Sequence, residues 1–308
     1  MILDDKKYID ENINFVAGVD EVGRGPLCGP VVASAVIFPK GLLVEGINDS
    51  KKLSQKKREF LFDIIHKKAL SIGIGVIHEN KIDEINILEA TILAMKDAVK
   101  KLTIRPDMIL VDGNMRDFSN ILQRNIIKGD SKSLCIAAAS IIAKVTRDRM
   151  MLEYNKIFPG YGLSTNMGYG TKEHISAITR NLSTPIHRQS FNPISNYTPK
   201  FKDILDIRKL SIELAASKIV KMGHEIISIK NDSLDYIDIL SLFDDEYFGF
   251  RLFSHEEDMV RNKSKMIKES ELALKEDNIK RDITSSMNIS VISVEFSQNK
   301  PKVIFKNI

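Results

Sequence analysis

Short apolar runs recur along the first 130 residues and are separated by polar or glycine-containing stretches. Runs at residues 15–19, 31–38, 72–77, 108–111 and 125–128 have the length and apolar content of strands. The first run stops at an acidic pair, and the fourth stops at an Asp-Gly dipeptide. These runs predict the strands of a sheet.

Apolar positions three and four residues apart predict helices over residues 54–69, 82–102, 133–157 and 171–181. Ser54 is a suitable N-cap for the first helix, and the second is expected to break near Asn86. Residues 159–170 hold four glycines and are expected to form a loop. Strands followed by helices of this length indicate an α/β layer architecture.

A second unit is expected to begin beyond residue 200. Residues 190–200 contain Pro and Asn with few long apolar side chains, which is typical of a linker. A helix followed by a strand is predicted between residues 213 and 227, and further strands at 236–240 and 248–253. The alternation of apolar and polar residues over 290–305 predicts more strands. We therefore expect two domains, residues 1–200 and residues 201–308.

Charge divides at the same place. The chain has 308 residues and a formal net charge of +4; residues 201–308 carry 17 basic and 19 acidic side chains, and residues 1–200 carry 28 and 22. A mildly basic first part is compatible with a nucleic-acid partner, but on charge alone solvated lysines are the favoured explanation. Two cysteines rule out a disulfide scaffold. Without a signal-peptide pattern or a long apolar run, we expect a soluble, cytoplasmic protein.

Acidic residues come directly after three of the predicted strands. Asp20 and Glu21 follow the first strand, Asp112 follows the fourth, and Asp130 follows the fifth. Ligands of α/β sheets bind outside the carboxyl ends of strands, so these four carboxylates can meet at one edge. They would repel one another without a cation, and oxygen ligands suit Mg²⁺ or Mn²⁺. Paired divalent ions can activate water and stabilise the leaving oxygen in phosphodiester cleavage.

A structural explanation competes at each position. Asp112-Gly113 is a common turn dipeptide whatever the function, so one carboxylate alone favours a turn, whereas four together favour a metal site. The adjoining Gly23-Arg24-Gly25 adds a phosphate-binding feature, because glycines admit a ligand close to the backbone and arginine offers a planar guanidinium. The alternative is a glycine-rich turn with a surface arginine.

The string from Gly18 to Val32, GVDEVGRGPLCGPVV, strongly resembles the signature of bacterial ribonuclease HII. Other motifs of that family follow in order over residues 12–195: a lysine loop at 49–54, aspartate motifs at 111–113 and 128–130, a signature helix at 137–148 (AAASIIAKVTRD), a tyrosine loop at 168–174 and a closing motif at 187–191. Such motifs in this order are very unlikely to arise by chance.

The resemblance implies a ribonuclease H-like α/β fold, in which helices flank a mixed central sheet. It implies a ribonuclease H that cleaves the RNA strand of RNA–DNA hybrids and nicks duplex DNA on the 5′ side of embedded ribonucleotides, leaving 3′-hydroxyl and 5′-phosphate ends. It further implies that Asp20, Glu21, Asp112 and Asp130 are catalytic and bind two divalent ions, Mn²⁺ or Mg²⁺. RNA–DNA hybrids and ribonucleotide-containing DNA would be the partners, and we expect a monomer.

The same resemblance assigns substrate contacts. It implies that Gly23, Arg24 and Gly25 grip the backbone around the ribonucleotide and sense its 2′-hydroxyl, the group that distinguishes RNA from DNA at a given sugar. It implies that Tyr169 stacks on the following sugar. This sequence departs from the family pattern just before the tyrosine loop, where residues 164–167 (STNM) replace the family's basic residues. We expect it to weaken a phosphate contact without affecting the metal site.

Other residues are weaker candidates. Lys51 is either a phosphate contact or a solvated loop lysine. Ser140 and Lys144 lie four apart on a predicted helix, so they either face the substrate together or serve core packing and helix solvation. Four more side chains are expected to be structural, the two cysteines as buried small residues: Cys28, Cys135, His174 and His187.

Residues 201–308 weakly resemble the small YraN-like family, which has a restriction-endonuclease-like fold. Such a fold would carry an Asp on one strand and a Glu-x-Lys on the next, together binding a metal. Asp238 fits the first position, but Phe250 and Leu252 stand where the Glu and Lys would be. We therefore expect a catalytically degenerate accessory α/β domain.

Two other classes of function stay open at this point. A phosphotransferase of the related actin-like ATPase architecture also places acidic and glycine-containing loops after strands, although Asp130 and the Gly18–Val32 string favour the nuclease. A non-catalytic binding protein for hybrid duplexes would not need all four carboxylates.

Overall fold

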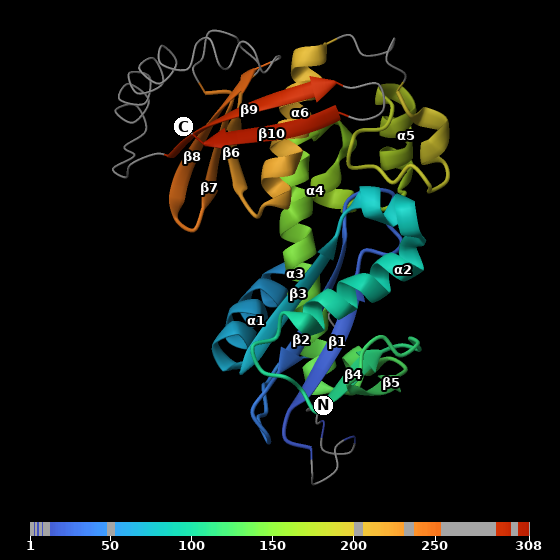
Figure 1. Ribbon diagram of the computed structural model, residues 1–308. Coiled ribbons are helices and arrows are strands. Elements are labelled where there is room, and N and C mark those ends of the chain that lie inside the picture. The colour runs from blue at the N-terminus through green and yellow to red at the C-terminus, as the bar shows by residue number, and fades with distance from the viewer. Residues whose placement is uncertain are drawn as a thin grey trace. The chain divides into compact units, whose positions relative to one another are not determined.

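A computed structural model describes residues 3, 5, 8, 13–47, 53–199, 206–230, 237–253, 288–296 and 301–307 (Figure 1). The chain forms two compact units. The first contains Met1–Met151, Thr165–Ser176 and Ile186–Tyr197, and the second contains Leu152–Ser164, Ala177–Pro185 and Thr198–Ile308. Two segments from the first 200 residues therefore group with the C-terminal part of the chain.

Five described strands form the sheet of the first unit, in the order β3-β2-β1-β4-β5. Its strands are β1 (Val16–Val22), β2 (Val31–Ile37), β3 (Ser71–Ile77), β4 (Met108–Asp112) and β5 (Leu122–Ile126). β1 and β2 pair antiparallel, as do β2 and β3, whereas β1–β4 and β4–β5 are parallel. The sheet is therefore mixed, as expected.

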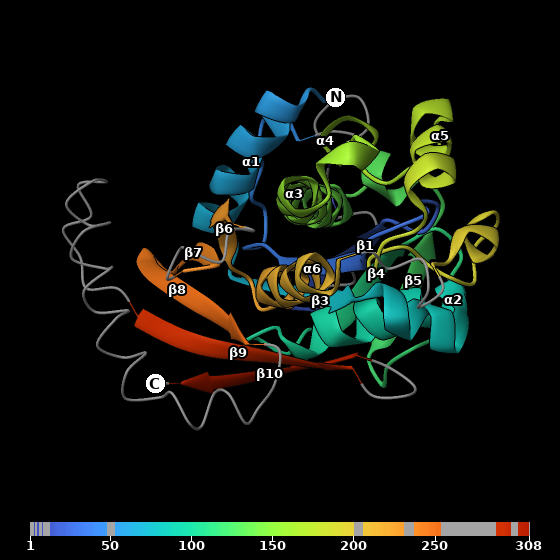
Figure 2. The same ribbon diagram turned by 90° about the horizontal axis from the view of Figure 1, so that it is seen from above.

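Helices cover both faces of this sheet (Figure 2). The helix α2 (Glu79–Lys100) packs on one face, where its Met95 shares a core with Val19 and Ala33. On the other face, α1 (Gln55–Lys68) and α3 (Leu134–Ile157) share a second core. The side chains of that second core include Leu61, Ile65, Ala138 and Ile142. The layered α/β architecture is confirmed.

Local signals explain how two of these helices begin and bend. Ser54 caps α1, its side chain accepting the N–H of Lys57 at 3.3 Å. Asn86 breaks α2 with a φ of 67°, and its side-chain oxygen accepts the N–H groups of Leu88 and Glu89 at 2.9 and 3.1 Å. It thereby caps the longer part of the helix.

A very close helix–sheet contact in this unit is made at Gly18 on β1. A Cβ atom there would lie 2.1 Å from the main-chain carbon of Cys135, so only glycine lets α3 approach the strand this closely. Side chains alternate along a strand, so Asp20 also faces α3. The close packing of β1 against this helix therefore determines where the Asp20 carboxylate points.

The second unit contains the other described sheet, in the order β10-β9-β8-β7-β6. Its elements are α6 (Ile207–Lys221), β6 (Glu225–Ile229), β7 (Ile239–Phe243), β8 (Glu246–Phe253), β9 (Asn288–Phe296) and β10 (Pro301–Asn307). Neighbouring strands pair antiparallel except β8 and β9, which are parallel. The helix-then-strand pattern and the strands predicted from apolar alternation are confirmed, but the strand expected at 236–240 lies at Ile239–Phe243.

Two sequence predictions were wrong in detail. The strand expected at 125–128 lies at Leu122–Ile126, because pairing with β4 places its register earlier. The segment 159–170 is not wholly a loop: the 3-10 helix η4 (Pro159–Tyr161) and the short helix α4 (Leu163–Asn166) fit between its glycines. Helix α5 (Lys172–Asn181) follows as expected, and the 3-10 helix η5 (Ile194–Tyr197) lies in the predicted linker. Among the described residues, no helix has the length and apolarity to cross a membrane.

Candidate active site

Asp20 and Asp112 lie side by side at the ends of two parallel strands. Val19 of β1 pairs with Val111 of β4, and each aspartate is the next residue of its strand. Asp20 is buried, and one of its carboxylate oxygens accepts the N–H of Glu21 at 2.8 Å. The expectation that strand ends bring these carboxylates together agrees with the sheet, although Asp20 and Glu21 belong to β1 itself.

Electrostatic repulsion among the carboxylates is visible in their pKa values. Burial, and then the charges of Glu21 and Asp112, raise the pKa of Asp20 well above its usual value, whereas a hydrogen bond from Ser140 acts in the opposite direction. Burial and Asp112 also raise the pKa of Glu21, against the lowering effect of the Arg24 guanidinium. Arg24 Nη1 lies 3.4 Å from Glu21 Oε1. These groups therefore resist ionisation in the absence of a cation.

Asp130 approaches Asp112 through the main chain. Asp112 Oδ1 accepts the N–H of Gly129 at 2.6 Å, which holds the turn that carries Asp130 against the end of β4. Asp130 is buried in the 3-10 helix η3 (Gly129–Ser131), and Lys128 before it has a left-handed φ of 57°. The loop after β5 thus brings the main chain next to Asp130 against the end of β4.

The donor set fits divalent cations of the magnesium type. The four acidic side chains offer carboxylate oxygens, which Mg²⁺ and Mn²⁺ prefer over the sulfur and nitrogen ligands that suit zinc. A bound cation would offset the repulsion that raises the pKa of Asp20 and Glu21. The chemistry of these side chains therefore suits such ions.

The glycine loop beside this cluster is held by Arg188, which is fully buried. Its guanidinium donates to the carbonyl oxygens of Gly23 at 2.6 Å, Arg24 at 2.9 Å and Gly29 at 2.9 Å. In a trans peptide the C=O and the following N–H point in opposite directions. The N–H groups of Arg24 and Gly25, both exposed residues, therefore point away from Arg188 and are placed to meet an anion.

Arg147 of α3 supports the same loop and is also fully buried. It donates to the carbonyl oxygens of Pro30 at 2.9 Å, Cys28 at 3.1 Å and Met167 at 3.0 Å. Gly23 has a φ of 94°, and a Cβ atom there would lie 2.4 Å from Arg147 Nε. Glycine is therefore needed at this position both for its conformation and for the close passage of the arginine.

Tyr169 meets the glycine loop from the other side. A Cβ atom on Gly25 would lie 3.6 Å from the Tyr169 ring, and the ring is 44% exposed. The two loops are joined where Leu27 N–H donates to the Gly168 carbonyl oxygen at 2.7 Å. Met167 takes a left-handed φ of 49° at the turn, and its carbonyl is bound to Arg147. An exposed ring next to exposed backbone donors is a suitable surface for a nucleotide.

Of the three weaker candidates, two are among the described residues. Ser140 lies on α3 and is hydrogen-bonded to the Asp20 carboxylate, so it contributes to the acidic cluster. Lys144 donates to Asp148 Oδ1 at 2.7 Å. Lys51 lies outside the described residues.

Sequence reasoning missed Arg147 and Arg188, the two residues whose guanidinium groups hold the glycine loop. Both stand in motifs of the resemblance, at 137–148 and 187–191, which was the available signal. Arginine is rarely fully buried, so neither the residue type nor the neighbouring sequence gave a reason to place either side chain in the interior.

Comparison with known proteins agrees with this geometry. The family model of Ribonuclease HII matches residues 17–194. The Ribonuclease HII of Listeria innocua serovar 6a is 51% identical over 194 residues, which cover 63% of this chain and 74% of that protein.

Solved structures share the fold. Ribonuclease H2 from Pyrococcus horikoshii OT3 matches with a TM-score of 0.53 and 27% identity, covering 59% of this chain and 96% of the other. A chain of the PCNA:RNase HII complex from Archaeoglobus fulgidus matches with a TM-score of 0.50 and 25% identity, covering 61% of this chain and 99% of the other. These matches confirm the ribonuclease H-like fold and give no support to the phosphotransferase or non-catalytic alternatives. The chain belongs to the ribonuclease HII family and is a ribonuclease H.

Proposed function

We propose that this enzyme cleaves the RNA strand of RNA–DNA hybrids and nicks duplex DNA on the 5′ side of embedded ribonucleotides, leaving 3′-hydroxyl and 5′-phosphate ends. Asp20, Glu21, Asp112 and Asp130 would be the catalytic residues. The proposal is carried by one observation: Asp20 and Asp112 directly follow the last paired residues of two neighbouring parallel strands, with Glu21 close enough to raise the pKa of Asp20.

We propose that the four carboxylates hold two divalent ions, Mg²⁺ or Mn²⁺. Such ions would supply activation of the attacking water and stabilisation of the leaving oxygen. The role of the protein is to fix the ligands before the substrate arrives. Ser140 and the Glu21 N–H orient the Asp20 carboxylate, and the Gly129 N–H orients that of Asp112. Orienting partners of this kind tune the ligands of a metal site.

Substrate contacts follow from the two loops. The N–H groups of Arg24 and Gly25 face outward and would bind the phosphate beside the ribonucleotide, with the half-exposed Arg24 side chain adding a charge-assisted contact. Tyr169, in contact range of Gly25, would stack on the next sugar and so favour deoxyribose there. The 2′-hydroxyl of the ribonucleotide would lie between the backbone N–H groups of the glycine loop and the Tyr169 ring, where the enzyme could distinguish it from a deoxyribose.

The second unit is proposed as a degenerate accessory domain. Asp238 is buried next to β7, and its carboxylate accepts the Leu252 N–H at 2.7 Å and pairs with Arg208 at 2.5 Å and Arg251 at 3.8 Å. Phe250, opposite Ile239 in the neighbouring strand, is a buried apolar residue. Asp238 is thus surrounded by guanidinium groups, whereas a metal site would need further carboxylates around it. This favours a structural role for Asp238.

The test is a labelled DNA duplex that contains one ribonucleotide, incubated with the full chain with and without Mg²⁺ or Mn²⁺. We expect one nick, 5′ of the ribonucleotide, that needs the metal; its ends are identified by ligation and by phosphatase sensitivity. An all-DNA duplex is the matched control and should stay intact. No nick with either metal would overturn the proposal. The monomeric state and the cytoplasmic location stay predictions, and sedimentation would check the first.

A further inference from the structure

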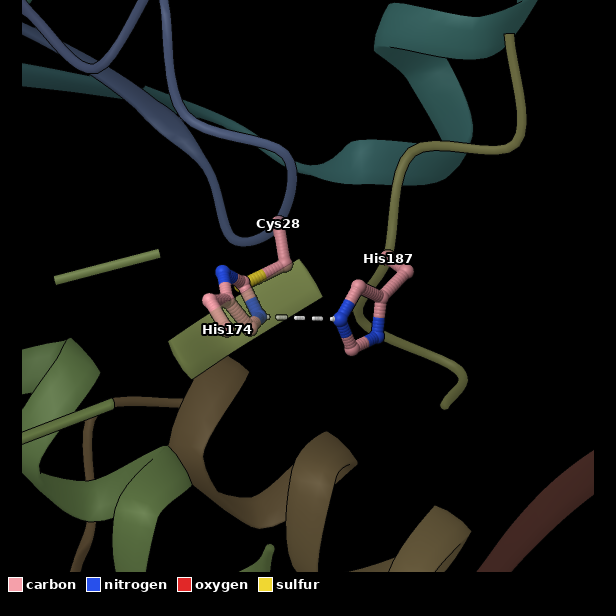
Figure 3. Close-up of side chains that lie close together, drawn as sticks. All are labelled: Cys28, His174 and His187. Carbon is pink, nitrogen blue, oxygen red and sulfur yellow. Dashed lines mark hydrogen bonds between the residues drawn. The ribbon is translucent and has the colours of Figure 1, made fainter. Parts of the chain in front are cut away.

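Three side chains with metal-binding atoms converge behind the loops that carry Gly25 and Tyr169. Cys28 lies in the glycine loop, His174 in the first turns of α5, and His187 in the segment that pairs with Cys28 through an isolated β-bridge (Figure 3). One ligand atom from each lies within 4.8 Å of the other two. All three residues are buried, at 0%, 0% and 1% exposure.

The tautomer of His174 directs a lone pair into this cluster. Its Nδ1 lies 2.9 Å from the carbonyl oxygen of Tyr169. A carbonyl oxygen only accepts, so Nδ1 carries the proton and Nε2 is left with its lone pair. That Nε2 lies 3.2 Å from Nε2 of His187, as the dashed line in Figure 3 marks. Metal-binding histidines commonly donate from their other nitrogen to a carbonyl in this way.

The distance between the two imidazole nitrogens fits a tetrahedral site. With bonds of about 2.0–2.1 Å to zinc, two nitrogen ligands lie about 3.3 Å apart. The 3.2 Å between the two Nε2 atoms is thus close to the distance that a shared ion needs. One thiolate and two imidazoles suit Zn²⁺ and disfavour Mg²⁺ or Mn²⁺.

We propose that Cys28, His174 and His187 form a second metal site that binds one zinc ion, with a water in the fourth position. It is separate in ligand chemistry from the carboxylate cluster and does not depend on the proposed reaction. Its role would be structural: the ion would tie the glycine loop through Cys28 to the tyrosine loop through the His174–Tyr169 hydrogen bond.

The charges around the proposed site affect its affinity for a metal ion. Burial raises the pKa of the Cys28 thiol to about 12, so without a metal the thiol keeps its proton. Arg147 and Arg188 favour the thiolate but repel a cation, whereas Glu79 does the opposite. Zinc binding would therefore release a proton, tighten as the pH rises, and be weaker than at a site with four protein ligands.

The first experiment follows the thiolate by spectroscopy. The full chain is stripped with a chelator, and Co²⁺ is added as a probe of the zinc site. We expect one Co²⁺ per chain that gives a thiolate-to-cobalt charge-transfer band, displaced by Zn²⁺ and unaffected by excess Mg²⁺. Cys28→Ser should lose the band. Cys135→Ser removes the other buried cysteine and should keep it, as the matched control.

Two further measurements keep the test decisive. The variant Asp112→Asn should retain the band, which separates this site from the carboxylates. If Cys28→Ser fails to fold, zinc-edge X-ray absorption of the unmodified chain still reports the ligands: a sulfur at about 2.3 Å with nitrogens at about 2.0 Å supports the proposal. Absence of both the cobalt band and the sulfur shell in the zinc-loaded protein would overturn it.

Discussion

Arg188 Nη2 donates a hydrogen bond of 2.6 Å to the carbonyl oxygen of Gly23, although 165 residues separate the two in the chain. This contact, with those to Arg24 and Gly29, makes a buried guanidinium the support on which the glycine loop rests. The desolvation that lowers the Arg188 pKa to about 10, helped by the nearby Arg147, still leaves it charged at neutral pH. A charged donor binds carbonyl oxygens more strongly than a neutral one does.

We expect Arg188→Lys to weaken recognition of the ribonucleotide. One ammonium cannot reach three carbonyl oxygens in the planar arrangement of a guanidinium, so the loop loses its fixed orientation. Hydrogen bonds to charged groups are worth about 1.5–3 kcal/mol each, so KM for the single-ribonucleotide duplex should rise about 10-fold or more and Tm should fall.

Steady-state kinetics separates KM from kcat in that variant. Arg149→Lys changes a surface arginine of α3 that pairs with Glu59, and it should leave the kinetics unchanged. An unaltered preference for ribose over deoxyribose in Arg188→Lys would contradict the supporting role.

Asp112→Asn should abolish cleavage while leaving duplex binding largely intact. A metal ion supplies several kcal/mol of transition-state stabilisation, so losing a ligand should lower kcat by at least about 100-fold. Binding by fluorescence anisotropy checks the second half of the expectation. Asp63→Asn, the same change at an exposed position of α1, is the control and should remain active. Full activity of Asp112→Asn would refute its role as a ligand.

The metal-free protein should lose stability as the pH rises from acidic to neutral. The pKa values of Asp20 and Glu21 are raised in the folded state above their ordinary 3.8 and 4.5, so the folded state holds these protons more tightly than the unfolded chain does. The stabilisation is complete below the ordinary values and is lost as the pH rises through the raised ones.

Asp20→Asn removes one of the repelling charges. We expect the metal-free variant to have a higher Tm than the unmodified chain at neutral pH, and the difference to vanish at acidic pH. Adding Mg²⁺ should raise the Tm of the unmodified chain more than that of the variant. Calorimetry in the presence of a chelator and of Mg²⁺ measures both. A lower neutral-pH Tm for metal-free Asp20→Asn would show that repulsion is not the dominant effect.

Tyr169→Ala should reduce selectivity for the junction between RNA and DNA. Aromatic stacking on a nucleotide is worth about 1–3 kcal/mol, so the preference should fall about 5- to 160-fold. Cut sites on a duplex with four consecutive ribonucleotides, resolved on a sequencing gel, provide the measurement. Tyr169→Phe keeps the ring and should retain the pattern. The ring is half exposed, so Tm should change little; an unchanged cut-site pattern in Tyr169→Ala would argue against stacking.

A chain shortened to end at Lys200 should still cleave, but at reduced stability. Every proposed metal ligand and loop contact precedes that residue. However, Glu153 and Lys156 at the end of α3 bind the main chain of Ile226, through its N–H at 2.7 Å and its carbonyl oxygen at 2.7 Å. These main-chain partners are lost on truncation. Thermal unfolding and the nicking assay test the two parts separately; an inactive but folded product would show that the second unit is needed for function.

The sequence by itself determined what local chemistry controls. Apolar runs placed the strands of the first sheet, Ser54 marked a helix start, Asn86 marked a helix break, and acidic residues at strand ends indicated the cluster around Asp20 and Asp112. These features depend on neighbouring residues, whose propensities and spacing can be read along the chain. The order of motifs then pointed to the family.

Only the tertiary structure decided which distant side chains meet. The burial of Arg147 and Arg188, the joining of Cys28 to His174 and His187, and the grouping of the end of α3 with the second unit all bring together residues far apart in sequence. Each depends on the path of the chain, because a side chain is buried or exposed according to what packs over it. Burying an arginine is favourable only where carbonyl oxygens converge on it, and that convergence exists only in the folded protein.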